Sequence, residues 1–369
     1  MLQPKDSSSA GNRGAGGYRV ALIRGGPEDD SGPEMMDAAL SVLKPLLSES
    51  GCPRVDFVEV EAGAHCARKY GNALPPESLQ TIRDLRVVFK APTAGAKSPG
   101  SAPVGVTIKK ALNTYANVTP CRSYRGVKTA LRPGIDMVMV RENTEGLPAS
   151  IFFRPVPDVS CETRVITRSA SQRIARVAFE MARSRRQRLT ICAVEARIFE
   201  GDIIFIEACK ELGKAYPEVH VDVRKPDALA GILVVNPESF DVVVAPNDWG
   251  FIISDEMVAT TGSVGLGPRA NLGDGAGLFE PIHGTAPGKA GKGTVNPISE
   301  VLAGKMMLEW LGSRHHDEAI TRVGRLIGEA VAQVLDEGLV LTGDMGGKAS
   351  TSEVAGAVLD RARTLLAQR

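Results

Sequence analysis

The chain has 369 residues, enough for one large or two medium domains. Its hydrophobic fraction of 43% and charged fraction of 24% are those of a globular protein, and a net charge of +1 gives no field that would hold nucleic acid or an acidic membrane surface. No run approaches the ~20 apolar residues that cross a bilayer, so we expect neither nucleic acid nor a membrane as a partner. The cysteines are scattered without a CxxC pair, which favours free thiols and a cytoplasmic location, with an organellar matrix as the alternative.

Residues 1–17 are rich in serine and glycine and lack an apolar core, which predicts a disordered tail. From residue 18 onward, apolar β-branched runs alternate with helical patterns, and this alternation predicts an α/β fold with a largely buried sheet. We expect strands at 18–23, 54–60, 86–89, 135–140, 188–194, 219–223 and 240–245. We expect helices at 33–47, 169–183, 202–212, 297–312, 316–337 and 351–367, the first with Gly32 as its cap.

Two segments rich in glycine and proline interrupt this order, at 91–105 and 262–297, and both are predicted to be long loops. Glycine-rich backbone can approach phosphates closely, so phosphate binding is favoured over a flexible surface loop for the second segment. The turn after the first strand, "LIRGGPEDDSG", lacks the GxGxxG spacing, so a Rossmann fold is not expected.

The stretch "NDWGFIISDE" (247–256) follows the apolar run "FDVVVAP". Acidic residues at the end of a buried strand often build a metal or catalytic site. Here, however, Asp255 lies one helical turn after Phe251 and not after another carboxylate. Asp248 is expected to be a surface or helix-cap residue.

Several motifs together resemble the isocitrate/isopropylmalate (β-decarboxylating) dehydrogenase family. They include "RENTEG" (141–146), "NPESFDVVVAPNDWG" (236–250), "FEPIHGTAPGKAGKGTVNP" (279–297) and "DMGGKASTSE" (344–353), and they keep the family's order across residues 18–367. "YANVTPCRS" (115–123) is most similar to the NAD-dependent isocitrate dehydrogenase branch.

The resemblance implies two α/β domains with a central mixed sheet. Residues 18–114 and 262–369 would form the large, nucleotide-binding domain, and residues 115–261 the small, dimerisation domain with a clasp near 148–167. The implied assembly is a homodimer, with a hetero-oligomer containing an intact paralogue as the alternative.

The family oxidises a 2-hydroxy acid and releases CO₂ with the help of Mg²⁺ or Mn²⁺ held by aspartates. Asp227, given to the partner chain, and Asp255 match two of these ligands, but the third falls on Phe251. The catalytic tyrosine corresponds to Pro148 and the catalytic lysine to Glu195, with Arg197 nearby. The resemblance therefore leaves Glu195, Asp227 and Asp255 as catalytic candidates, suggests a Glu195–Arg197 ion pair, and gives a degenerate metal site that argues against ordinary Mg²⁺ or Mn²⁺ binding.

A small carboxylate ligand is implied, together with NAD or NADP. The substrate-binding positions correspond to Lys90, Lys109, Thr119, Arg141 and Arg197, of which Lys109 and Thr119 replace arginines of the family. The cofactor-binding positions correspond to His283, Gly284, Thr285, Ala286, Pro287, Lys289 and Asn296. The first loop of the family carries extra acidic residues here, Glu28, Asp29 and Asp30.

Three functions are compatible with these departures. The favoured one is an enzyme that acts on a carboxylate by altered chemistry. The second is a non-catalytic regulatory or partner subunit that binds nucleotide or a carboxylate. The third is an active NAD(P)-dependent 2-hydroxy acid dehydrogenase in which Asp248 and Glu195 replace the lost groups.

Overall fold

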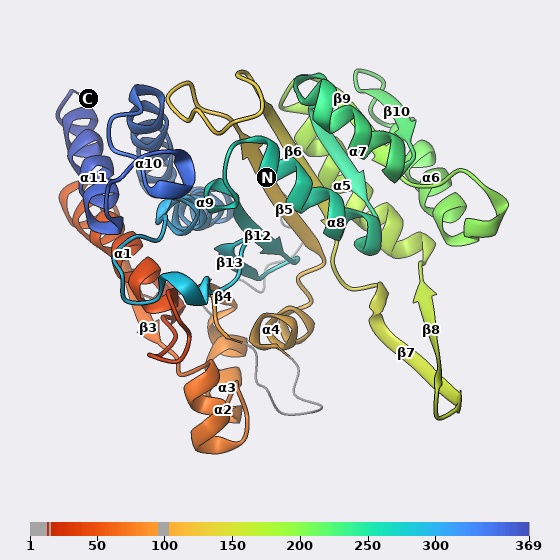
Figure 1. Ribbon diagram of the computed structural model, residues 1–369, viewed down its shortest axis with the longest axis horizontal. Coiled ribbons are helices and arrows are strands. Elements are labelled where there is room, and N and C mark those ends of the chain that lie inside the picture. Colours follow the sequence, from red (N-terminus) through yellow and green to blue (C-terminus); the bar gives the residue numbers. More distant parts are fainter. Residues whose placement is uncertain (1–12, 15, 95–102, 369) are drawn as a thin grey trace.

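The computed structural model describes residues 13–14, 16–94 and 103–368, and it is an α/β structure built on one large mixed sheet (Figure 1). The strands are β1 Arg13–Gly14, β2 Gly17–Ile23, β3 Arg54–Glu59, β4 Val87–Lys90, β5 Ala116–Arg122, β6 Asp136–Glu142, β7 Gly146–Val156, β8 Val159–Val165, β9 Arg188–Cys192, β10 His220–Arg224, β11 Val242–Ala245, β12 Pro268–Leu272 and β13 Gly277–Pro281. The helices are α1 Gly32–Glu49, α2 Ala64–Tyr70, α3 Pro76–Leu85, α4 Val104–Leu112, α5 Arg168–Arg183, α6 Glu200–Gly213, α7 Pro226–Val235, α8 Asn247–Thr260, α9 Ile298–His315, α10 Glu318–Glu337 and α11 Thr351–Ala367. In this part of the chain, no helix is long and apolar enough to cross a membrane.

The large sheet has the strand order β1-β2-β4-β13-β12-β5-β6-β11-β9-β10, with β3 beside β2. Its two outer parts are mostly parallel, whereas β12 runs antiparallel to both β13 and β5, and β5 runs antiparallel to β6. The sheet is continuous across both predicted domains because β5 of the small one pairs with β12 of the large one. The division into two domains stays a prediction.

Helices cover both faces of the sheet. On one face, α1, α5, α6, α9, α10 and α11 bury the largest apolar cluster. On the other face, α3 and α4 cover one end and α7 and α8 cover the other, each with a separate apolar cluster. Between these two apolar clusters, the middle strands of the second face carry polar side chains. The candidate site lies at these polar side chains.

The strands β7 and β8 form a separate hairpin that extends away from the rest of the chain (Figure 1). It carries a group of exposed apolar side chains: Ile151, Phe152, Phe153, Val156 and Val159. The hairpin lies where the clasp is predicted. Its role in joining two subunits is not tested by a single chain.

The predicted α/β alternation is confirmed, but the prediction of a long loop at 262–297 is wrong for its middle part, where β12 and β13 form. Pairing with β5 and β4 stabilises these two short strands between glycine-rich turns.

Three smaller expectations also differ from the structure. Residues 1–17 were expected to be disordered, but Arg13 and Gly14 pair with β2. Residues 1–12 lie outside the described part of the chain. The helix α1 has Ser31 and not Gly32 at its N-cap. The predicted loop at 91–105 contains the start of α4, and its residues 95–102 lie outside the described part.

Candidate functional site

A line of hydrogen-bonded polar side chains crosses the middle of the sheet. Strand alternation places Thr119 and Asn117 of β5, Asn271 of β12 and Glu280 of β13 on the same face. Thr119 donates to Asn117 (3.1 Å), the Asn117 amide donates to Asn271 (2.8 Å), and the Asn271 amide donates to Glu280 (3.0 Å). Glu280 then accepts from Lys90 of β4 at 3.0 Å. We call these five residues the polar strip.

Four cations surround Glu280: Lys90, Lys109, Arg141 and Arg269, which we call the cationic cluster. Burial alone would raise the pKa of Glu280, but Lys90, Arg269 and Lys109 outweigh it and lower that pKa to about 2. Burial is the largest cause that lowers the pKa of Lys109; Glu280 opposes it, the neighbouring cations Arg141, Arg269 and Lys90 add to it, and the net pKa is about 8. Lys109 therefore exchanges its proton near neutral pH.

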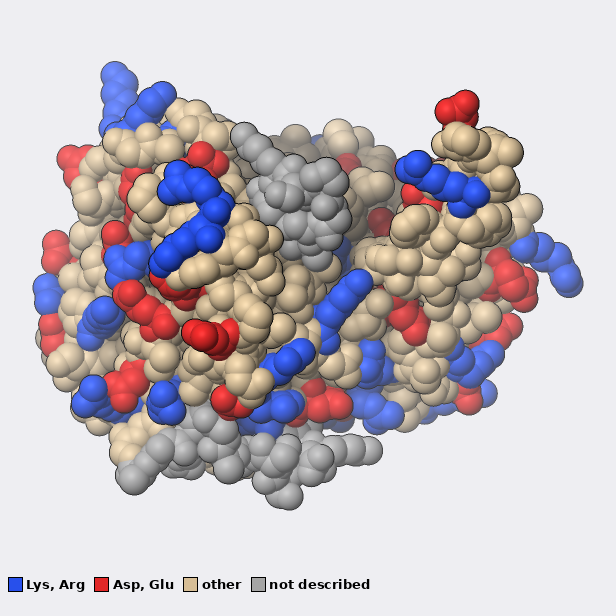
Figure 2. All heavy atoms as spheres, turned by 90° about the horizontal axis from the view of Figure 1, so that it is seen from below, with Lys and Arg blue, Asp and Glu red and all other residues tan. Residues whose placement is uncertain are grey.

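The guanidinium groups of the cluster retain free hydrogen-bonding capacity. Arg141 lies under the first turn of α8, where a Cβ on Gly250 would come within 2.6 Å of its Cγ, so the glycine permits this packing. The buried Nε atoms of Arg141 and Arg269 have no hydrogen-bond acceptor among the described residues. Buried donors of this kind are normally satisfied, which indicates that a ligand or solvent meets them. In Figure 2 a hollow separates the two sides of the molecule, and blue Lys and Arg atoms are visible within it.

In the single chain, the position that the resemblance implies for a divalent metal ion has one carboxylate on α8, Asp255. Phe251 lies one turn before Asp255 on α8, and its ring lies 5.6 Å from the guanidinium carbon of Arg141. Burial raises the pKa of Asp255, while Arg269 and Arg141 act against this rise. Asp255 thus has two cations and a phenyl ring around it, where an ion would need several oxygen ligands. Within the described residues of one chain, no three side chains of histidine, cysteine or acidic type gather as a metal site.

Asp248 is not a helix cap, because α8 has Pro246 at its N-cap and Asp248 in its first turn. One carboxylate oxygen accepts from the backbone N–H of Leu147 at 3.0 Å, and the other accepts from Arg164 Nε at 2.6 Å. Both oxygens hold the start of the β7–β8 hairpin against α8. Asp248 therefore has a structural role and is not placed to replace a lost catalytic group.

Glu195, Arg197 and Asp227 lie outside the cationic cluster and are exposed. The predicted ion pair between Glu195 and Arg197 is wrong. Glu195 instead accepts from Lys210 of α6 at 3.1 Å, because α6 folds back beside the end of β9. Asp227 lies in the first turn of α7. By contrast, Lys90, Lys109, Thr119, Arg141 and Asp255 are brought together as expected.

The predicted cofactor loop lies next to the cationic cluster. His283 is hydrogen-bonded to Ser299 of α9 (2.9 Å), and burial lowers the pKa of its imidazole. Asn296 donates to Asp344 at 2.9 Å, and Lys289 is one of the groups that lower the pKa of that carboxyl. A Cβ on Gly284 would meet no atom within 4 Å, so backbone at this point is open to a ligand. These groups, with Thr285, Ala286 and Pro287, could hold a nucleotide.

The loop that carries Asp29 and Asp30 is hydrogen-bonded to this cofactor loop. The Thr285 hydroxyl donates to Asp30 at 2.6 Å, and the Ser31 N–H donates to the Thr285 carbonyl at 3.1 Å. Asp29 is fully buried and accepts from the backbone N–H groups of Gly26, Ala64 and Ala94. Asp29 and Asp30 are therefore structural groups that fix the loop.

Sequence reasoning missed several members of this site, namely Asn117, Asn271, Arg269, Glu280 and the buried Glu300. The first four alternate with apolar residues along β5, β12 and β13, so a period of two was the available signal. Glu300 lies in the first turn of α9, fully buried, and neither carboxyl oxygen has a partner among the described residues.

Comparisons with known proteins show the family of the chain. The family model for isocitrate/isopropylmalate dehydrogenase matches residues 19–358. A 3-isopropylmalate/3-methylmalate dehydrogenase of Methanocaldococcus jannaschii is 38% identical over 351 residues, covering 94% of this chain and 99% of that protein. An isocitrate/homoisocitrate dehydrogenase of Thermus thermophilus is 38% identical over 353 residues, covering 94% of this chain and 99% of that protein.

Among solved structures, isocitrate dehydrogenase from Methylococcus capsulatus has a TM-score of 0.83 at 36% identity, covering 94% of this chain and 99% of that chain. These relatives are named for different substrates, so the choice of a branch within the family stays a prediction. The family model and these relatives, which extend over nearly the whole chain, show that the chain belongs to the isocitrate/isopropylmalate dehydrogenase family.

Proposed function

We propose that this chain binds a small di- or tricarboxylate on the cationic cluster and acts on it by chemistry other than the metal-dependent oxidative decarboxylation of its family. The observation that carries the proposal is the position of Phe251 over Arg141, where the family would place a metal ligand. The ring leaves the arginine available for an anion while supplying no oxygen for a cation.

Lys109 is the proposed proton-transfer group. Its pKa of about 8 lies close to neutral pH, where a lysine both donates and accepts protons efficiently. The other substrate-binding groups would be Lys90, Arg141 and Thr119. Glu195, Arg197 and Asp227 are exposed in the single chain, as residues donated to a partner's site would be.

NAD or NADP would be held by the loop from His283 to Pro287 together with Asn296, and Lys289 is the residue that would meet a 2′-phosphate. When bound, the nicotinamide would accept or supply a hydride. In this proposal the chain's own residues bind and orient the carboxylate beside the loop, and Lys109 moves a proton.

The proposed assembly is a homodimer. Its support is the set of exposed apolar side chains on the β7–β8 hairpin, with further ones at Val234 and Val235 of α7 and Ile252 of α8. The chain is proposed to be cytoplasmic, since all six cysteines of the described residues are free thiols.

Calorimetric titration with citrate, isocitrate and 3-isopropylmalate in the presence of EDTA tests the binding step. At least one ligand should bind without metal, and Arg141→Gln should weaken it about tenfold or more, as expected for loss of a charge-assisted hydrogen bond. The matched control is Arg83→Gln, an exposed arginine on α3. Absence of binding by all three ligands, or equal binding by both variants, would contradict the proposal.

A partner or regulatory subunit is the second candidate, and the same exposed apolar side chains support it. Native mass spectrometry of the protein purified from its own cells distinguishes the two. A homodimer supports the enzyme, and a constant stoichiometry with an intact paralogue supports the subunit.

The third candidate, an active decarboxylating dehydrogenase, has less support because Asp248 is bound to Arg164 and Glu195 to Lys210.

A further inference from the structure

A second pocket lies on the opposite face of the sheet from the polar strip. Strand alternation turns Val118 and Pro120 of β5 toward this face, whereas Asn117 and Thr119 belong to the strip. The pocket lies between α5 and α9 and consists of two chambers. Pro120, Lys305 and Met306 line both of them, so the chambers are continuous. We call the whole space the rear pocket.

The inner chamber has a volume of about 380 Å³ and is mostly apolar. Its walls include Val118, Val138, Val177, Leu272, Phe279 and Trp310. A chamber of this size lies within the ~300–1,000 Å³ typical of small-molecule sites, and its walls would stabilise a hydrocarbon chain by removing it from water.

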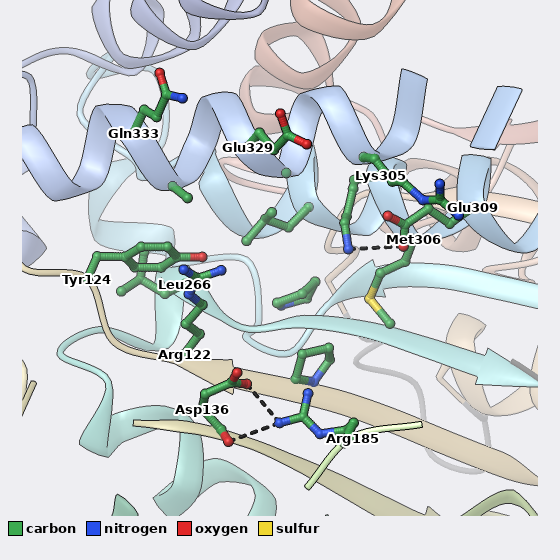
Figure 3. A pocket seen from close by; sticks show the side chains of 16 residues that line it. Arg122, Tyr124, Asp136, Arg185, Leu266, Lys305, Met306, Glu309, Glu329 and Gln333 are labelled. Atoms are coloured by element: carbon green, nitrogen blue, oxygen red, sulfur yellow. Dashed lines mark hydrogen bonds and ion pairs between the residues drawn. The ribbon is translucent and has the colours of Figure 1, made fainter. Parts of the chain in front are cut away.

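The outer chamber has a volume of about 550 Å³ and holds charged residues of both signs (Figure 3). Three acidic residues line it: Asp136, Glu309 and Glu329. Arg185 pairs with Asp136 at 2.9 Å, and Lys305 pairs with Glu309 at 3.0 Å. Four cations also line it, namely Arg122, Arg185, Lys305 and Arg325, so its formal charge is +1, which matches a ligand with a single negative charge.

Arg325 pairs with Glu318 at 2.9 Å, so among the described residues that line this end of the rear pocket Arg122 is the cation available to a ligand. Its guanidinium lies over the ring of Tyr124 at 5.4 Å, and no carboxylate of the described residues lies within ion-pair distance of it. Figure 3 shows its side chain rising from β5 into the space below α10. An arginine guanidinium presents two parallel N–H groups, which match a carboxylate.

We propose that the rear pocket binds a medium-chain monocarboxylate. The hydrocarbon chain occupies the inner chamber against Val118 and Trp310, and the carboxylate pairs with Arg122 in the outer chamber. The site shares no residue with the cationic cluster, so its occupant does not compete with a carboxylate bound on the other face.

Tryptophan fluorescence tests this proposal at the pocket itself. The chain has two tryptophans, and Trp310 lines the inner chamber while Trp249 lies on α8. In a Trp249→Phe variant, emission therefore reports on Trp310 alone. Titration with ω-bromodecanoate, whose bromine quenches nearby indole, should give saturable quenching that unlabelled decanoate reverses.

Charge and chain length are tested with matched probes and variants. Arg122→Gln should raise the dissociation constant for decanoate about tenfold, Arg122→Lys should raise it less, and Arg83→Gln should leave it unchanged. Decanol and acetate should each bind more weakly than decanoate. Circular dichroism melting of each variant verifies that it is folded. Quenching that does not saturate, or equal affinities for Arg122→Gln and Arg83→Gln, would overturn the proposal.

Discussion

At the scale of single residues, Phe251 and Asp255 are proposed to decide whether the α8 face holds a metal ion or an anion. Replacing the ring by a carboxylate, Phe251→Asp, would place two aspartates at positions i and i+4 on one helix face. We expect this variant to bind Mn²⁺ measurably more tightly than the wild type, as detected by electron paramagnetic resonance titration.

Leu339→Asp is the control for this change, since Leu339 is exposed after α10 and the new carboxylate would lie off α8. Equal Mn²⁺ affinity for the two variants would show that the geometry of α8 is not what excludes the ion.

Lys109 makes ligand binding depend on pH. Its pKa of about 8 means that it is a cation below that pH and neutral above it. Affinity for a dicarboxylate should therefore fall by about an order of magnitude between about pH 7 and pH 9, the loss expected for one charge-assisted hydrogen bond. Lys109→Arg should flatten this profile because arginine keeps its proton, and calorimetry over the range measures both. A parallel fall in the arginine variant would assign the titration to another group.

Glu300 makes stability depend on pH. Burial raises the pKa of its carboxyl well above 4.5, so the folded chain keeps a proton that the unfolded chain releases. The free energy of unfolding therefore falls as the pH rises from the unfolded value toward the folded one. Glu300→Gln removes the titrating group and should raise the melting temperature by a few degrees at about pH 8, but much less near pH 5. Glu162→Gln, at an exposed position of β8, should change neither value.

At the scale of elements, the β7–β8 hairpin is predicted to join two subunits. Phe152 and Phe153 are 63% and 59% exposed in the single chain, and burying them would favour association. The double change Phe152→Ser with Phe153→Ser should shift the protein from dimer to monomer in analytical ultracentrifugation. Leu339→Ser is the control, because Leu339 is 84% exposed but lies after α10, away from the hairpin. A monomeric wild type would contradict the prediction.

Elements with long periodic patterns, and short strands with continuous apolar runs such as β4 and β11, were predictable from the sequence, whereas β12 and β13 were not. The helices α9, α10 and α11 repeat their apolar residues over several turns, and their bounds lie close to those expected. The strands β12 and β13 have five residues each between glycine-rich turns, and their stability comes from pairing with strands distant in sequence. For the same reason Arg269 and Asn271 were not recognised as site residues.

At the scale of the whole molecule, motifs located most of the candidate site, but contacts between elements decided how its residues are paired. Lys90, Lys109 and Arg141 are far apart in sequence and surround one carboxylate, Glu280. The partner of Glu195 could not be predicted, because Lys210 reaches it only once α6 has packed against α5 and β10. The rear pocket also arises from the packing of α5 and α9 over the central strands and leaves no local pattern in the sequence.

The cationic cluster is proposed to bind carboxylates without supporting the metal-dependent reaction of the family. This proposal is tested most directly by NADH and NADPH formation from isocitrate and from 3-isopropylmalate with Mg²⁺, assayed on protein that calorimetry shows to bind one of these ligands. The resemblance implies that two proton-transfer groups and one metal ligand are replaced, and loss of each proton-transfer group alone lowers a rate by about 10²–10⁴-fold. We expect binding with no Mg²⁺-dependent cofactor reduction above background. Robust cofactor reduction that requires Mg²⁺ would contradict the account.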